Sequence, residues 1–279
     1  MSVALVSSAE NSVLSKGLSS DSRVFWKTYG RGSKIVIGLH GWSGDHRSFE
    51  PIIDQMPDDV TFISFDQPGF GQSQPPVEWN VRSIAEPIFE VLEGLPSTPM
   101  TIVGSCSGAV VGMELGMMLG PRVNRLLMID PFMTAPWFFR LFCWGWLGKV
   151  CYYSTFANPL GRWLTNIGLA HRRTDDTSLT EHFESADHGR ALGYLRALCD
   201  PALHHRGYER LDAIGEFVVG GRTFTSVVRS VEWWQKTRWP SAPLQVLPTA
   251  GHMPVHEATD DVARTVFGPG LRATVPERA

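Results

Sequence analysis

The sequence lacks an uncharged apolar run long enough to cross a bilayer, which takes roughly 18 residues. The closest stretch runs from Trp137 to Tyr153 and is interrupted by Arg140 and Lys149, so it predicts a helix that covers the rest of the fold. The first 20 residues also lack a basic start followed by an apolar run, and we expect no secretory signal. Both absences favour a cytoplasmic protein with no membrane span.

Cysteine is scarce, and charge of either sign does not dominate. The four cysteines (Cys106, Cys143, Cys151 and Cys199) form no CxxC pair and have no zinc-type spacing with histidine. We therefore expect reduced thiols, with neither a metal ion nor a cofactor. The formal net charge is only −3, with Lys and Arg scattered along the chain. This distribution argues against nucleic acid as a partner.

The composition that remains is that of a globular protein. Hydrophobic residues make up 43% of the 279 residues and charged residues 19%. Short apolar runs alternate with helical patterns, which predicts parallel strands joined by crossover helices. The expected strands are Arg23–Tyr29, Lys34–His40, Val60–Asp66, Met100–Gly104, Arg125–Asp130, Glu216–Gly220 and Leu244–Pro248. The expected helices are His46–Gln55, Val81–Leu95, Ser107–Leu119 and Ser226–Lys236.

A helical insertion rich in aromatic residues separates the strands Arg125–Asp130 and Glu216–Gly220. We expect residues 132–212 to form a cap, with residues 1–131 and 213–279 forming the core. The aromatic side chains of the cap can pack on the core by ordinary hydrophobic contacts. They can also line an apolar tunnel for an acyl or aromatic substrate, and both interpretations can hold at once.

The motif Gly104-Ser105-Cys106-Ser107-Gly108 lies between an apolar strand and a predicted helix. A tight strand-to-helix turn needs small residues two before and two after the reactive side chain, and Gly104 and Gly108 fill those places around Cys106. A second register, centred on Ser107, is sterically possible. The helix N-terminus would favour a thiolate at Cys106. An inert buried cysteine is the alternative.

A His-Gly motif and a Gly-His motif flank this turn in the sequence. The strand Val36–Leu39 ends in His40-Gly41-Trp42, and the last predicted strand is followed by Gly251-His252. We expect His40 to position its loop and His252 to act as a base. His256 is expected to be a loop or helix-capping residue.

These motifs, together with the Asp66-Gln67-Pro68-Gly69-Phe70-Gly71 turn, resemble the α/β-hydrolase fold family with a cysteine in its nucleophile elbow. The resemblance implies a mostly parallel sheet flanked by helices, with a helical cap after the sixth main strand. It implies the order nucleophile, acid, His. It also implies an oxyanion hole formed by the backbone N–H groups of Trp42 and Ser107.

The acid departs from the usual pattern of that family. The stretch Gly220-Gly221-Arg222-Thr223 carries no carboxylate where the family usually places one. Asp130 ends the sixth strand, a position that some members use instead, so we expect a triad of Cys106, His252 and Asp130. Glu232 is a weaker substitute. Asp130 can also merely begin the cap by accepting backbone hydrogen bonds.

A reactive cysteine with these partners predicts acyl chemistry. The leading hypothesis is a thioesterase or esterase acting on a small-molecule acyl substrate, such as one carried on CoA or an acyl carrier protein, or on a lactone. The runner-up is an acyltransferase that passes the acyl group from Cys106 to a second substrate. Two other hypotheses remain: a non-catalytic binder of a small apolar ligand, and cofactor-free proton-transfer chemistry in the same pocket.

Overall fold

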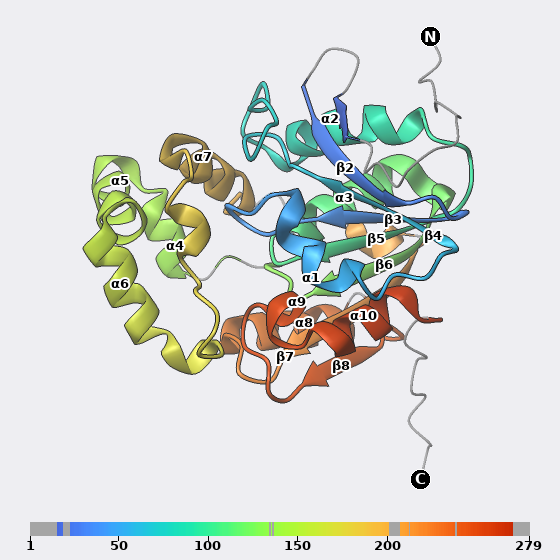
Figure 1. Cartoon of the computed structure of the whole chain (residues 1–279). Helices are drawn as coiled ribbons and strands as arrows, with labels where there is room; N and C mark the ends of the chain where they lie inside the picture. Colours follow the sequence, from blue (N-terminus) through green and yellow to red (C-terminus); the bar gives the residue numbers. More distant parts are fainter. Residues whose placement is uncertain are drawn as a thin grey trace.

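The computed structural model describes residues 16–18, 23–133, 135, 137–200, 207–211, 213–237 and 239–269. Its strands form one twisted sheet in the order β1-β2-β4-β3-β5-β6-β7-β8 (Figure 1). They are β1 (Lys16–Leu18), β2 (Phe25–Gly30), β3 (Lys34–Leu39), β4 (Val60–Phe65), β5 (Met100–Ser105), β6 (Val123–Ile129), β7 (Ile214–Gly220) and β8 (Leu244–Leu247).

The sheet is parallel from β4 through β8, and only β1 and β2 run antiparallel to their neighbours. This confirms the predicted fold class. The strand that ends just before Asp130 is the sixth, and the inserted helices follow it, as the resemblance implied. Parallel strands place all their carboxyl ends at one edge of the sheet, so the loops after β3, β5, β6, β7 and β8 gather there.

Helices cover both faces of the sheet because alternate strand residues point to opposite sides. On one face, Leu39, Ile102 and Met128 belong to a core that also contains side chains of α2 (Val81–Glu93), α3 (Gly108–Leu119) and α8 (Thr225–Thr237). On the other face, Val103 and Leu127 pack with residues of α1 (Glu50–Ile53), α9 (Pro254–Glu257) and α10 (Thr259–Phe267). These side chains are buried, so the sheet is a rigid support for the loops at its edge.

All regular structure described between β6 and β7 is helical. It comprises α4 (Trp137–Phe142), α5 (Gly145–Tyr152), α6 (Pro159–Gly168), α7 (His188–Leu198), the π turn Tyr153–Ala157 and short 3₁₀ turns. These helices lie to one side of the sheet, at the left of Figure 1. They fall within the predicted cap, whose domain limits of 132–212 stay a prediction.

The single covering helix predicted from Trp137 to Tyr153 is wrong. The chain forms two helices there, α4 and α5, with Trp144 extended between them and Gly145 at φ +54°. Glycine adopts this left-handed conformation without strain, so it lets the chain turn where the apolar pattern runs on unbroken. No helix in the described part of the chain is long and apolar enough to span a membrane.

Candidate active site

Cys106 sits in a tight turn between β5 and α3. Its φ of +50° is unusual for a residue with a side chain. The turn is fixed by backbone bonds, because the Cys106 N–H donates to the Ile129 carbonyl at 2.8 Å and its carbonyl accepts from the Phe132 N–H at 3.0 Å. Strained backbone of this kind persists only where surrounding structure holds it in place.

The glycines on either side of this turn are required by close packing. A Cβ at Gly104 would lie 2.5 Å from the Ala109 backbone, and one at Gly108 would lie 2.1 Å from the Leu39 carbonyl oxygen. Both distances are far below a normal contact, so larger residues would push β5 and α3 apart. The spacing of the two glycines therefore centres the turn on Cys106.

The structure brings together the three residues that the sequence proposed as a triad. Cys106 Sγ lies 3.6 Å from His252 Nε2, and His252 Nδ1 is hydrogen-bonded to Asp130 Oδ2. The three residues come from the ends of β5, β8 and β6, which meet at the same edge of the sheet. The Phe224 ring packs edge-on against the imidazole, with ring centroids 4.9 Å apart.

Asp130 is fully buried and has a φ of +46°, a left-handed conformation that Asp tolerates better than most residues. Its Oδ1 accepts from the Gly220 N–H at 3.0 Å, and its Oδ2 accepts from the Thr223 hydroxyl. The carboxylate is thus held from β7 while it faces His252. Glu232, the weaker substitute for the acid, lies exposed on α8.

Sequence reasoning missed the contribution of Thr223. Its hydroxyl bonds Asp130 and lies 3.2 Å from His252 Nδ1. The only available signal was its place after Gly220-Gly221, where the family usually carries the acid. A hydroxyl there holds a carboxylate that comes from another strand.

The loop that carries His252 is held partly by the cap. The His252 N–H donates to the Arg172 carbonyl at 2.9 Å. Glu257 accepts from the backbone of Gly251 at 2.6 Å and of Thr174 at 2.8 Å. One carboxylate therefore joins the His252 loop to the cap segment after α6, so the position of the imidazole depends on that segment.

The charge of Asp130 governs the protonation of His252. Burial lowers the pKa of the imidazole, but the charge of Asp130 and its hydrogen bond outweigh this, with a smaller contribution from the Cys106 side chain. The net effect raises the pKa of His252 to about 10. The imidazole is therefore held as a cation at neutral pH, directly beside the sulfur.

The two residues expected to form an oxyanion hole lie next to Cys106. A Cβ at Gly41 would lie 3.0 Å from Cys106 Cβ, so the loop carrying Trp42 packs directly against the cysteine. Ser107 follows Cys106 and precedes α3. Among the described residues, the backbone N–H groups of Trp42 and Ser107 donate to no protein acceptor.

His40 fixes the loop after β3 through hydrogen bonds of both its ring nitrogens. It is fully buried, its Nδ1–H donates to the Gly41 carbonyl at 2.7 Å, and its Nε2 accepts from the Gln67 N–H at 2.9 Å. Burial lowers the pKa of His40 and keeps it neutral, as this donor and acceptor pattern requires. Gln67 also accepts from the hydroxyl of Tyr194 in α7 at 2.7 Å, which extends the network into the cap.

Trp42 joins the same loop to the cap through its side chain. Its Nε1–H donates to the Ala191 carbonyl of α7 at 2.8 Å. Its ring packs against Phe139, Phe156 and Phe183, with centroid distances of 5.6, 5.2 and 4.8 Å. The cap is therefore docked on a residue whose backbone adjoins Cys106.

A cavity of about 490 Å³ opens between the cap and Cys106. Cys106 and His252 form part of its wall, and Phe138, Phe139 and Phe156 line it from the cap. Among the described residues, its other imidazoles are those of His182 and His256, and no Asp, Glu, Lys or Arg side chain lines it. Some cap aromatic rings therefore do line a pocket, and the ring contacts of Trp42 show that some of the same rings pack on the core.

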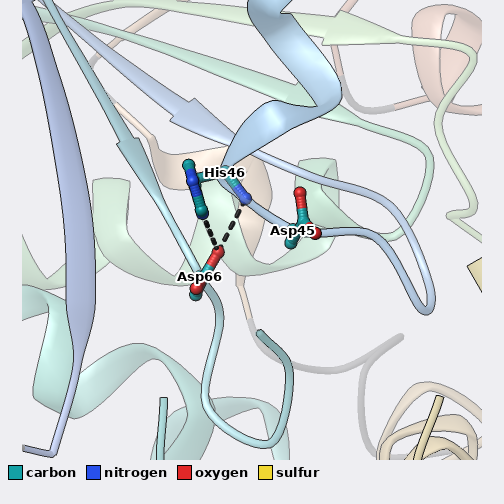
Figure 2. A group of neighbouring side chains, drawn as sticks. All are labelled: Asp45, His46 and Asp66. Atoms are coloured by element: carbon teal, nitrogen blue, oxygen red, sulfur yellow. Dashed lines mark hydrogen bonds and ion pairs between the residues drawn. The ribbon is translucent and has the colours of Figure 1, made fainter. Parts of the chain in front are cut away.

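One group of side chains elsewhere has the donor types of a metal site (Figure 2). Asp45, His46 and Asp66 have potential ligand atoms within 4.8 Å of one another. Their atoms are already engaged: Asp66 Oδ1 accepts from His46 Nδ1 and from its backbone N–H, each at 2.7 Å, and Asp45 pairs with Arg47. Asp66 Oδ2 accepts from the Gln72 N–H at 2.8 Å, so this group fixes the loops after β3 and β4.

Known structures share the architecture. The Cif epoxide hydrolase from Acinetobacter nosocomialis superposes with a TM-score of 0.75 at 17% identity, covering 93% of this chain and 90% of that one. An esterase from Exiguobacterium antarcticum gives a TM-score of 0.66 at 18% identity, covering 91% and 98%. At these identities the likeness concerns the fold alone.

Sequence relatives point the same way. The human "Serine hydrolase-like protein" and "Serine hydrolase-like protein 2" are each 29% identical over 98 residues, which is 34% of this chain. The match spans 48% and 31% of those relatives, less than half of either. Residues 36–265 match the alpha/beta hydrolase family over most of the chain. The chain belongs to the alpha/beta hydrolase family.

Proposed function

We propose that the protein is a cysteine-dependent acyl hydrolase that cleaves a thioester or ester through an acyl-Cys106 intermediate. The observation that carries the proposal is the contact of Cys106 Sγ with His252 Nε2 at 3.6 Å, with Asp130 on the other imidazole nitrogen. A thiolate beside an imidazolium is a strong nucleophile, and Asp130 favours the imidazolium.

In the first step the Cys106 sulfur forms a bond to the acyl carbon and the carbonyl oxygen becomes an oxyanion. The N–H groups of Trp42 and Ser107 are free to stabilise it, which is worth roughly 3 kcal/mol of barrier for each donor. The bond to the leaving thiol or alcohol then breaks, and that group takes the proton from His252. In the second step His252 accepts a proton from water as the water oxygen bonds to the acyl carbon. The C–S bond then breaks, which releases the acid and restores the Cys106 thiolate beside the His252 imidazolium.

The cavity supports an uncharged, apolar acyl group as the substrate. Phenylalanine rings dominate its cap side, and a charged group buried there would lose its hydration with no Asp, Glu, Lys or Arg among the described lining residues to pair with it. A carrier such as CoA or an acyl carrier protein would therefore stay outside, with only the acyl part buried. Exchange of one thioester for another is nearly balanced in energy, which favours a thioester donor.

The test combines product release with intact-protein mass spectrometry. Purified protein is mixed with acyl-thioesters of increasing chain length, and the proposal expects free acid together with a transient mass increase equal to the acyl group on Cys106. The human relatives are named serine hydrolase-like. A Cys106→Ser variant therefore tests whether oxygen can replace sulfur at this position. Acyl-enzyme without acid, resolved only by an added acceptor, would make the protein an acyltransferase. No adduct and no acid would leave a binding protein.

A further inference from the structure

The outer side of the cap carries most of the large apolar side chains that the described structure leaves in solvent. All but four of them lie between Phe138 and Ile167, the exceptions being Val77, Met117, Trp233 and Val246. Trp146 is 73% exposed, Trp144 69% and Trp163 59%. Large apolar side chains exposed in such number on one part of a folded protein indicate an interaction site.

In α6 the exposed apolar residues form one stripe. Leu160, Trp163, Leu164 and Ile167 follow the i, i+3, i+4, i+7 spacing of a single helix face, and each is more than half exposed. In α5, Trp146 and Val150 repeat the i, i+4 spacing. The two helices lie one after the other along the left edge of the molecule in Figure 1. We call the exposed apolar residues of 144–150 and 160–167 the outer face.

The charged residues within the chain segment that carries the outer face have one sign. From Pro131 to Thr174 the chain contains no Asp or Glu but five basic residues, although the whole protein has a net charge of −3. Arg140 and Lys149 are exposed beside the apolar residues, and the Lys149 ammonium lies over the Tyr153 ring at 5.8 Å. Exposed Trp and Leu residues flanked by Lys and Arg are the composition of helices that lie in a membrane interface.

We propose that the outer face docks onto the surface of a lipid bilayer that bears anionic headgroups. The apolar rings would enter the boundary between headgroups and acyl chains, and Arg140 and Lys149 would meet the negative surface. A second copy of this chain is a poorer occupant, because a two-fold contact would bring the same cations together with no carboxylate from this segment to pair with them.

The position of α6 gives this docking a consequence for the active site. Thr165 and Leu169 line the cavity, whereas Trp163 and Ile167 belong to the outer face. One helix thus separates the membrane-facing surface from the pocket at Cys106. If the proposed function holds, this arrangement favours an acyl substrate that partitions into membranes. The docking itself does not rest on that function.

Flotation with vesicles tests the proposal. The full chain is mixed with vesicles of phosphatidylcholine alone and of phosphatidylcholine with phosphatidylglycerol, and the bound fraction is measured. We expect binding to the anionic vesicles, with a loss of roughly a hundredfold in Trp146→Ala/Trp163→Ala, since burial of each ring is worth about tenfold or more. Arg140→Gln/Lys149→Gln should lose about fivefold per charge. Trp233→Ala, which removes a half-exposed tryptophan of α8, is the matched control and should bind like the wild type.

Each alternative outcome overturns the docking. If the wild type and Trp146→Ala/Trp163→Ala bind equally, the outer face does not make the contact with the vesicle. If the wild type binds equally to both vesicle types, anionic headgroups are not required. A concentration-dependent dimer that this double variant dissociates, with no flotation of the wild type, would assign the face to a second copy. Cys106→Ala should float like the wild type, so failure of the acyl chemistry and failure of docking are separate results.

Discussion

The core and the cap both line the pocket, but they differ in how firmly their residues are held and in how much apolar surface they expose. In the core, strained backbone at Cys106 and Asp130 is held by buried strands and by hydrogen bonds from neighbouring loops. The cap packs one side of its helices into the same buried cluster as the sheet but leaves many large apolar side chains in solvent. The contrast indicates that geometry for chemistry is fixed in the sheet, while contact with the surroundings belongs to the inserted helices.

The two regions are nevertheless joined where chemistry would take place. The hydrogen bonds between them include those of the Trp42 indole to Ala191, of Tyr194 to Gln67, and of the His252 N–H to the Arg172 carbonyl. Each of them reaches a loop that surrounds Cys106. Changes in the core should therefore act mainly on reaction rate, and changes at these links should act mainly on stability and on movement of the cap.

The largest effect is expected for Cys106→Ala, a change confined to the core. It removes the attacking sulfur, so acid release from an acyl-thioester should fall by at least about 10³-fold, and the acyl adduct should vanish. His252→Ala should cause a loss of similar size. Cys151→Ala, which changes an exposed cap cysteine, is the control and should leave both readouts unchanged. An adduct that persists in Cys106→Ala and disappears in Ser107→Ala would move the nucleophile to Ser107.

The next effect concerns the charge held between Asp130 and His252. Because the pKa of His252 is raised to about 10 in the folded protein, its protonated form contributes stability in full below its ordinary pKa of about 6.5. That contribution is lost as the pH rises toward about 10. The free energy of unfolding should thus fall by up to roughly 1.4 kcal/mol per pH unit across this window, relative to His252→Gln.

Urea unfolding of both proteins across that window gives the measurement. Both should be prepared with Cys106→Ser, which removes titration of the thiol and keeps Asp130, the main group that raises the pKa of His252. If the free energies of unfolding of the two proteins changed with pH in the same way, His252 would not be held as a cation. The proposed pairing of the Cys106 sulfur with an imidazolium would then be rejected.

The core strands and the turn at Cys106 could be predicted because both depend on short-range patterns. Alternating apolar runs define parallel strands, and a glycine on each side of Cys106 satisfies a steric demand within five residues. The position of Asp130 was also readable, as the carboxylate at the end of a strand adjacent to β5. Constraints of this kind involve residues close together in the sequence, so they can be inferred without the tertiary structure.

The remaining features depend on residues far apart in the chain. Thr223 bonds Asp130 across 93 positions, and no local pattern marks a hydroxyl for that purpose. The turn at Gly145 was hidden because the apolar residues continue through it, and composition alone does not tell which cap rings face the cavity or the solvent. Tertiary packing decides where such a helix breaks and which way its side chains point, and the helix propensity of the residues predicts this only weakly.

Thr223→Val should have an intermediate effect, because it leaves the buried Asp130 carboxylate with one donor fewer. The expected cost is about 1–3 kcal/mol in the free energy of unfolding, with slower acylation if the aspartate moves away from His252. Thr223→Ser keeps the hydroxyl and should restore both properties. Restoration by serine separates a positioning role from simple packing, and equal acylation rates in Thr223→Val and wild type would reject that role.

The smallest effect is expected at the contact between core and cap, in Trp42→Phe. This change removes the indole N–H that donates to Ala191, while the backbone N–H beside Cys106 stays in place. One neutral hydrogen bond contributes about 0.5–1.5 kcal/mol, so α7 should exchange its amide hydrogens faster, with little change in the rate of Cys106 acylation.

Trp234→Phe provides the control for this change. Trp234 is buried, and its Nε1–H has no acceptor among the described residues, so the substitution removes no hydrogen bond. Hydrogen exchange in α7 should then match the wild type. If Trp42→Phe instead abolished acylation while α7 stayed protected, the indole would act on the reacting groups themselves. The division between a core that fixes the chemistry and a cap that is merely docked on it would then fail at Trp42.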